Sequence, residues 1–180
     1  MRYVVLFRGI NVGGRNKIPM AALRDHLTGR FENVRSYIQT GNILLDSDLP
    51  ASQVAAHVER SLPTAFDLDS ELVRVLVLEP TAFRAVLDGA PPMFGSEPEK
   101  HRYDVWFYVG ITAAEVQPHI PVNPDVDEVV CGDLAFYHRR VTALASRSRV
   151  NKIVGTPVYA SLTTRSWRTV TALGQMLGGS

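Results

Sequence analysis

The apolar positions of the first eighty residues follow two different periods, which predict a sheet covered by helices. Continuous or alternating apolar runs, rich in β-branched residues, predict strands over 2–10, 34–39, 43–46 and 71–78. Between these runs, apolar residues recur at helical spacing over 20–31 and 52–66. The predicted order through residue 78 is therefore βαββαβ, the arrangement of a ferredoxin-like unit.

The second half of the chain repeats this order in outline, without the last strand. A short helix over 81–88 leads into a stretch rich in proline, glycine and charge, which we interpret as a linker or long surface loop. Thr163 or Thr164 is expected to cap a final helix over 166–177. The predicted fold class is α+β. Its parts are a ferredoxin-like βαββαβ subdomain at 1–88, a linker at 89–102 and a smaller βαββα-type subdomain at 103–180.

Composition indicates a folded protein without a disulfide framework. The chain has 180 residues, of which 46% are hydrophobic and 21% charged, as in globular proteins. No apolar run approaches the roughly 20 residues of a membrane helix, and we expect neither a secretory signal nor a membrane partner. Cys131 is the only cysteine, and the five histidines lack metal-ligand spacing. We therefore expect a cytoplasmic protein with no metal site and no cofactor.

Charge is divided unevenly along the chain although the net charge is only +1. Residues 1–45 and 136–180 are basic, whereas residues 46–135 are strongly acidic. Two interpretations stay open at this point. The basic ends could share one positive face of the protein, or they could pair with the acidic middle in surface salt bridges.

Two short polar segments, each following a predicted strand, are the best candidates for a binding site. The first, Arg8–Lys17, combines glycines with three cations, and the second is Gln39–Asn42. Glycine-rich loops expose backbone N–H groups, and nearby cations make such a surface suited to anions. In a βαββαβ unit the first two strands run parallel, so both segments should lie at the same end of the sheet.

Neither segment carries a known nucleotide fingerprint. The spacing of Gly9, Gly13 and Gly14 matches neither the Walker motif nor the dinucleotide-binding motif. The alternative interpretation is that these glycines and Gly41 only permit positive φ in turns.

The run LFRGINVGGRNKIPMAALR, followed by VRSYIQTGNILLDS, resembles the bacterial family known as domain of unknown function 1697. The segment TTRSWRTV, which begins at Thr163, is similar to the family's second motif. This chain departs from the family pattern at Thr40, Ser166 and Arg168. The resemblance implies an α+β fold with ferredoxin-like character and brings no established activity. The pairing of motifs at both ends further implies that they converge on one site.

The final helix contributes the last candidates. We expect Trp167 to anchor this helix, with Arg165 and Arg168 pointing outward. A cation near a helix N-terminus opposes the helix dipole, so Arg165 indicates either a bound anion or a salt bridge to the acidic middle. The complete set of predicted ligand-binding residues is Arg8, Asn11, Gly13, Gly14, Arg15, Lys17, Gln39, Thr40, Gly41, Asn42, Thr164, Arg165 and Trp167.

Three functions are compatible with these residues. The leading hypothesis is a binding module for a phosphate-bearing anion: a nucleotide, a sugar phosphate or nucleic acid. Nucleic acid is the weakest of these, since the sheet aromatics Tyr3, Phe7 and Tyr37 form no recognised RNA-binding motif. A second hypothesis is a metal-independent enzyme that uses Arg8, Lys17, Gln39 and Asn42. The third is a non-catalytic interaction or oligomer scaffold. Substrate, catalysed reaction and oligomeric state are not predictable from the sequence.

Overall fold

A computed structural model describes residues 1–69 and 73–178, which form two compact units. Unit 1 comprises Met1–Phe83 together with the described end of the chain from Met176, and unit 2 comprises Arg84–Gln175. The stretch at 89–102, predicted as a linker or long loop, belongs to unit 2. No helix in the described part of the chain has the length and apolarity needed to cross a membrane.

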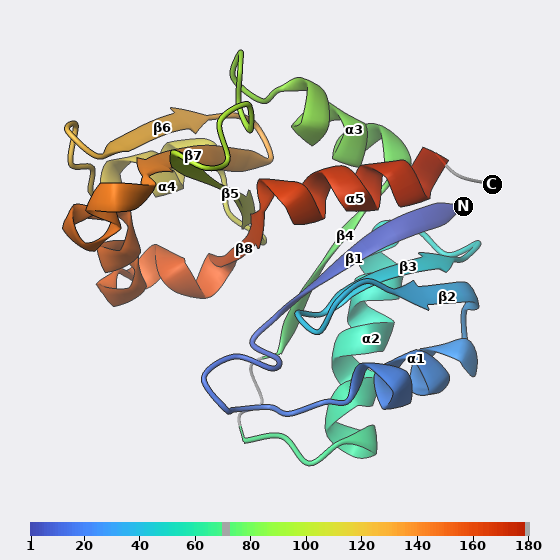
Figure 1. The fold of residues 1–180 in the computed structure, drawn as a ribbon. Coiled ribbons are helices and arrows are strands. Elements are labelled where there is room, and N and C mark those ends of the chain that lie inside the picture. The colour runs from blue at the N-terminus through green and yellow to red at the C-terminus, as the bar shows by residue number, and fades with distance from the viewer. Residues whose placement is uncertain (70–72, 179–180) are drawn as a thin grey trace. The chain divides into compact units, whose positions relative to one another are not determined.

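Unit 1 contains a four-stranded antiparallel sheet with the order β2-β3-β1-β4 (Figure 1). Val5 of the central strand pairs with Ile43 on one side and with Val77 on the other. Residues 71 and 72 of the predicted fourth strand lie outside the described residues. The strands are β1 (Arg2–Arg8), β2 (Glu32–Ser36), β3 (Asn42–Asp46) and β4 (Arg74–Leu78). This order confirms the ferredoxin-like arrangement predicted from the apolar pattern.

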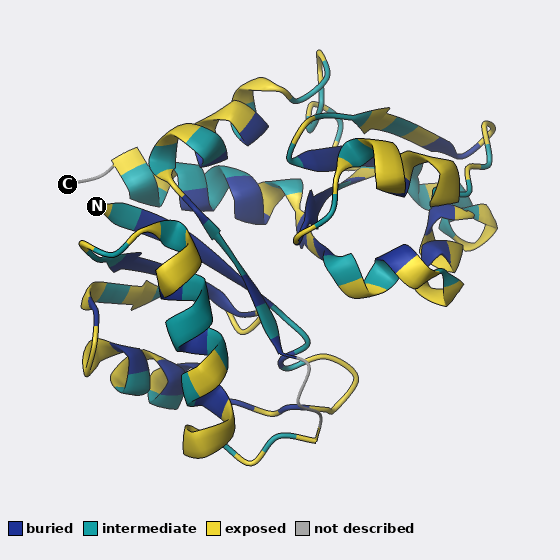
Figure 2. Cartoon of the chain, turned by 180° about the vertical axis from the view of Figure 1, so that it is seen from behind, coloured by how far each residue is buried: buried dark blue, intermediate teal, exposed yellow. Residues whose placement is uncertain are grey.

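Two amphipathic helices, α1 (Met20–Thr28) and α2 (Ala51–Ala65), pack their apolar residues into the core of unit 1. Burying each such side chain contributes roughly 1.5–3 kcal/mol. The strand β1 is buried at all five of its central positions, as expected for its continuous apolar run (Figure 2). A third helix, α3 (Pro80–Asp88), begins two residues after β4. The buried helix residues of this core are Met20, Leu23, Leu27, Val54, Val58 and Leu62.

Unit 2 contains a second four-stranded antiparallel sheet, with the order β6-β7-β5-β8. Its strands are β5 (His101–Tyr108), β6 (Asp127–Cys131), β7 (Ala135–Val141) and β8 (Leu162–Ser166). The α+β class is thus confirmed, but the expected βαββα order is incomplete because unit 2 has β8 as a fourth strand. This strand, LTTRS, lacks an apolar pattern and is defined by its pairing with β5, for example Phe107 with Thr163.

The helical layer of unit 2 is less regular than that of unit 1. It begins with α4 (Ala113–Val116) and the 3₁₀ turn η1 (Gln117–His119). Three 3₁₀ helices then connect β7 to β8, and the last two bury Val150, Ile153 and Val158 against Trp106 and Phe136. The bounds of these helices are η2 (Thr142–Arg147), η3 (Val150–Gly155) and η4 (Pro157–Ser161).

The last helix, α5 (Trp167–Gly178), follows β8 directly. Ser166 caps it, because the Ser166 hydroxyl accepts a hydrogen bond from the Thr169 backbone N–H at 3.3 Å. The prediction that Thr163 or Thr164 caps this helix is therefore wrong. Both threonines lie in β8, where their β-branched side chains suit an extended backbone.

Candidate functional site

The structure brings the two polar segments of unit 1 together. We call residues 9–17 the glycine loop and residues 37–41 the hairpin tip. The side-chain amide of Asn11 donates to the Gln39 carbonyl at 3.1 Å and to the Ile18 carbonyl at 2.9 Å. The Asn11 side-chain oxygen accepts from the Ile18 N–H at 2.8 Å. Asn11 thus fixes the glycine loop against the hairpin tip, and this leaves its side chain little capacity to bind a ligand.

Asn16 holds the glycine loop closed from within, although it was not among the predicted site residues. Its side chain is buried and donates to the Gly9 carbonyl at 2.7 Å, while its backbone N–H donates to Asp69 at 2.7 Å. Its backbone oxygen accepts from the Asn11 N–H at 3.1 Å. Both asparagines adopt positive φ, which asparagine tolerates better than most residues. That preference is the sequence signal that could have identified Asn16.

The tip of the glycine loop is open and positively charged. Gly13 and Gly14 have φ of +59° and +78°, and a Cβ added at either would meet no heavy atom within 4 Å. These glycines therefore serve backbone conformation rather than close packing. The side chains of Arg15 and Lys17 are exposed, and neither forms an ion pair with any residue that the structure describes. Arg8, at the end of β1, is half-buried and has partners of its own.

The hairpin tip and the adjoining Asn42 include both residues that hold the turn and residues that are exposed. The side-chain amide of Asn42 is fully buried and donates to the Tyr37 carbonyl and the Thr40 hydroxyl, both at 3.0 Å. Gly41 has φ of +71°, and a Cβ added there would lie 2.7 Å from Phe7 Cβ. Gly41 and Asn42 therefore maintain the turn. Gln39 and Thr40 are exposed.

The predicted site residues of the tail, Thr164, Arg165 and Trp167, belong to unit 2. Because the glycine loop belongs to unit 1, the convergence of the two motifs stays a prediction. Arg165 does not point outward as expected: it lies in β8, is 7% exposed, and donates to the Thr163 hydroxyl at 2.9 Å and the Thr164 carbonyl at 2.7 Å. Burial lowers the pKa of Arg165 to about 10. The exposed cation in the first turn of α5 is Arg168 instead.

Several cations of the basic residues 136–180 pair with acids of residues 46–135. Such pairs belong to the interpretation in which the basic ends form salt bridges with the acidic middle. Arg140 lies 3.4 Å from Asp104, and Arg147 lies 3.9 Å from Asp125. Arg139 pairs with Glu128 on the neighbouring strand. These three cations are therefore partly neutralised within unit 2, in contrast to Arg15 and Lys17 of unit 1.

A buried polar network in unit 2 combines an aspartate, a histidine and a serine without forming a catalytic triad. Asp127 accepts from His138 Nε2 at 2.9 Å and from the Ser148 hydroxyl at 2.6 Å. It also accepts from the backbone N–H groups of Asn123 and Arg149. Serine and histidine both bind the carboxylate rather than each other, so no nucleophile is activated.

The pKa values of this network fit a structural role. Burial alone would raise the pKa of Asp127, but its four hydrogen bonds outweigh burial and lower the pKa to about 2. Burial lowers the pKa of His138, against the opposing effect of Asp127. Burial also raises the pKa of Cys131, which disfavours the reactive thiolate. Within the described residues, no three His, Cys, Asp or Glu side chains are grouped so as to hold a metal ion.

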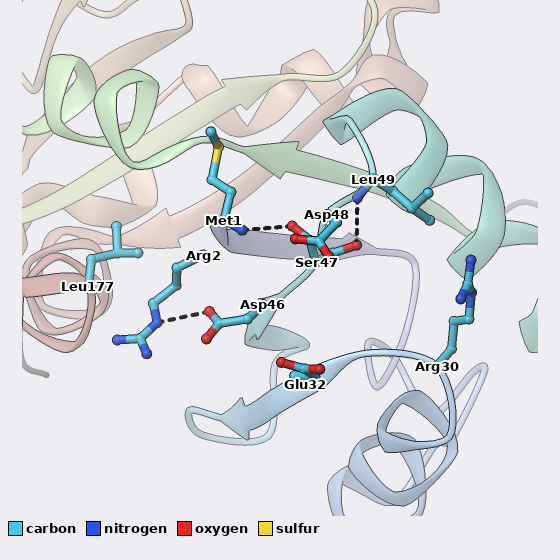
Figure 3. A pocket seen from close by; sticks show the side chains of 9 residues that line it. All are labelled: Met1, Arg2, Arg30, Glu32, Asp46, Ser47, Asp48, Leu49 and Leu177. Atoms are coloured by element: carbon cyan, nitrogen blue, oxygen red, sulfur yellow. Dashed lines mark hydrogen bonds and ion pairs between the residues drawn. The ribbon is translucent and has the colours of Figure 1, made fainter.

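A pocket of about 640 Å³ lies in unit 1 near the start of β1 (Figure 3). Two of its cationic groups already have partners: Arg2 binds Asp46 at 3.1 Å, and the amino group of Met1 donates to the Ser47 carbonyl at 2.7 Å. Burial would raise the pKa of Asp46, but hydrogen bonds from Arg2 and Asn33 lower it. The carboxylates of Glu32, Asp46 and Asp48 in its lining make this pocket a weaker anion site than the glycine loop.

The unit 1 sheet does not offer its aromatic residues to nucleic-acid bases. Tyr3 and Phe7 are only 3% and 2% exposed and belong to the hydrophobic core. These two residues therefore have no exposed ring face on which a base could stack. Tyr37 is half-buried at the hairpin tip.

Comparison with known proteins gives a family and a fold. The sequence model of the family described as "Protein of unknown function (DUF1697)" matches residues 1–137. The tail motif that begins at Thr163 lies beyond this match. The conserved bacterial protein SP0830 from Streptococcus pneumoniae is 28% identical in sequence, and its structure superposes with a TM-score of 0.79 over 98% of each chain. No curated protein matches the chain.

Proposed function

We propose a function for this chain on the basis of its exposed glycine loop. The chain belongs to the DUF1697 family of proteins of unknown function. The match over residues 1–137 confirms the family resemblance, and the family description names no activity. Our proposal is that unit 1 binds a small phosphate-bearing anion, such as a nucleotide or a sugar phosphate. The protein would act as a binding module in the cytoplasm.

One observation carries the proposal: two exposed cations without ion-pair partners in the described chain sit on a loop whose backbone is already fixed. Hydrogen bonds from Asn11 and Asn16 hold the loop that presents Arg15 and Lys17. A ligand that binds there does not have to order the loop, so less free energy is lost on binding. Charge-assisted hydrogen bonds to phosphate are among the strongest that a protein surface makes.

The two alternative functions receive less support from the geometry. An enzyme that used Arg8, Lys17, Gln39 and Asn42 would lose two of its four groups, since Asn42 is fully buried and Arg8 is half-buried with other partners. A pure scaffold explains Gly41, which packs on Phe7, but gives no reason for two exposed cations beside Gly13 and Gly14. Nucleic acid is disfavoured by the burial of Tyr3 and Phe7.

The test is a thermal-shift screen of the full chain against inorganic phosphate, nucleotides, phosphosugars and oligonucleotides, followed by calorimetric titration of each hit. The double variant Arg15→Ala/Lys17→Ala should lose at least about tenfold in affinity, which corresponds to about 1.4 kcal/mol. Arg24→Ala/Arg60→Ala is the matched control, because it removes two exposed cations from α1 and α2. Equal affinities for the two double variants would contradict the proposal.

Salt dependence separates a small ligand from nucleic acid. Binding of an oligonucleotide should weaken steeply with salt, in proportion to the number of phosphates contacted. A small phosphate ester contacted by two cations should show a much shallower dependence. A steep oligonucleotide response that disappears in Arg15→Ala/Lys17→Ala would replace the small-ligand proposal with nucleic-acid binding at the same loop.

A further inference from the structure

Unit 2 contains a pocket of about 670 Å³ at the end of its sheet where β5 begins and β8 ends. This volume is in the range of pockets that hold small organic ligands. Every lining residue belongs to unit 2. We call it the Trp167 pocket; the residues that carry its chemistry are His101, Arg102, Asp104, Arg140, Trp167 and Arg168.

The Trp167 pocket carries an excess of positive charge. Arg102 and Arg168 are exposed, and neither forms an ion pair within the described part of the chain. A third cation, Arg140, lies 3.4 Å from Asp104, which is the only acid in the lining. The pocket therefore has two guanidinium groups available for an anion, and guanidinium geometry suits bidentate binding of phosphate.

Trp167 gives the pocket an aromatic wall that is held in place before any ligand binds. A Cβ added at Gly95 would lie 2.3 Å from Trp167 Cδ1, so only glycine allows the backbone to approach the indole so closely. Gly95 also has φ of +88°. Phe94 packs edge-on against the same indole with ring centroids 5.2 Å apart. The indole remains half-exposed where it lines the pocket.

The walls also contain unused hydrogen-bonding capacity. Arg140 Nε and Thr142 Oγ1 are buried without a hydrogen-bond partner in the described structure, and both residues line the pocket. His101 Nδ1 is already oriented toward Glu97 Oε2, 3.7 Å away. Asp104 faces Arg140 with its carboxylate oxygen Oδ2. Its other oxygen can accept a hydrogen bond from a ligand hydroxyl. Buried polar atoms are normally satisfied, so this wall is suited to a polar ligand after small side-chain rotations.

From these features we propose that the Trp167 pocket binds a phosphorylated ligand with a planar ring, of the nucleoside monophosphate class. Arg102 and Arg168 hold the phosphate, the indole of Trp167 stacks on the ring, and Asp104 accepts from a sugar hydroxyl. This site lies in unit 2 and does not depend on the glycine loop of unit 1.

The test uses the intrinsic fluorescence of the full chain, because Trp167 and Trp106 are its only tryptophans and Trp106 is only 6% exposed. Titration with adenosine monophosphate should quench the emission, whereas adenosine or inorganic phosphate alone should bind at least about tenfold more weakly. Trp106→Phe should keep the quenching and Trp167→Phe should abolish it. Quenching that persists in Trp167→Phe would overturn the proposal.

A pair of charge-matched variants decides the role of the cations. Arg102→Ala/Arg168→Ala should weaken adenosine monophosphate binding at least about tenfold. Arg149→Ala/Lys152→Ala removes two exposed cations elsewhere in unit 2 and should leave it unchanged. Equal weakening by both pairs, or by neither, would overturn the proposal, and this result stands even if Trp167→Phe fails to fold. Arg15→Ala/Lys17→Ala should not affect the quenching, which keeps this test distinct from that of the glycine loop.

Discussion

In both units the first strand lies between the third and fourth strands of its sheet: β1 between β3 and β4, and β5 between β7 and β8. The helices that cover the two sheets nevertheless differ. In unit 1 the connection from β3 to β4 is formed by α2, a regular helix of 15 residues with an apolar stripe. In unit 2 the corresponding connection consists of three 3₁₀ helices. The same strand order therefore does not require the same helical layer.

The buried polar network of unit 2 compensates for its irregular connection. The Asp127 carboxylate binds β7 through His138 and the 142–149 segment through Ser148 and the Arg149 N–H. The first residue of β2 in unit 1, Glu32, is exposed instead. A continuous apolar stripe orients α2, whereas in unit 2 hydrogen bonds to one buried carboxylate hold the first part of the connection, before η3 and η4 bury their apolar residues.

The substitution with the largest expected effect removes the carboxylate at the centre of this network. Asp127→Ala should lower the free energy of unfolding by about 4 kcal/mol, because it leaves His138, Ser148 and two backbone N–H groups without their acceptor. Glu32→Ala is the matched control at the first position of β2 and should change it by no more than about 0.5 kcal/mol. Urea denaturation of both variants measures the difference. Similar values for the two would show that unit 2 does not depend on its carboxylate.

The hairpin tips of the two sheets give the next largest contrast. Gly41→Ala should destabilise the protein by about 3 kcal/mol, since it combines positive φ with a contact of 2.7 Å to Phe7 Cβ. Gly132, in the β6–β7 turn, has only the Ala135 carbonyl at 3.2 Å and the Tyr137 ring at 3.4 Å near an added Cβ. Gly132→Ala should therefore cost less than about 1 kcal/mol. Thermal denaturation is the measurement, and a Gly132→Ala loss as large as that of Gly41→Ala would contradict the assignment.

The smallest expected effect is a pH dependence that comes from unit 2. The pKa of His138 is lower in the folded protein than the 6.5 of an unperturbed histidine. As pH falls, the unfolded chain therefore takes up a proton on His138 before the folded protein does. The contribution of neutral His138 to the free energy of unfolding is complete above about pH 6.5 and is lost as pH falls. The loss is at most about 1.4 kcal/mol per pH unit. Asp127 stays charged over this range because its pKa is lowered to about 2.

His138→Gln tests this dependence. A glutamine amide can still donate to Asp127 but does not titrate, so the stability of the variant should fall less steeply below about pH 6.5. Denaturant titrations at several pH values give the slopes. An unchanged slope would assign the dependence to other groups, such as His57, whose pKa burial also lowers.

The fold of unit 1 was largely predictable from the sequence, and that of unit 2 only in part. The strand β1 and the helices α1 and α2 have apolar periods that their burial reproduces. The strand β8 was missed because its residues Thr163, Thr164 and Arg165 show no apolar alternation. It forms because the backbone edge of β5 is available for pairing, and backbone pairing leaves little trace in a sequence.

The same division applies to the candidate site. The sequence determined where the loops meet, because the βαββαβ order places the ends of β1 and β2 at one end of the sheet. It also determined that glycines and cations share the first loop. Only the tertiary structure decided that Asn11, Gly41 and Asn42 hold the loops in place, that Arg165 is buried, and that Arg102, Trp167 and Arg168 line one pocket. Burial and hydrogen bonding depend on residues distant along the chain, and local sequence does not specify those neighbours.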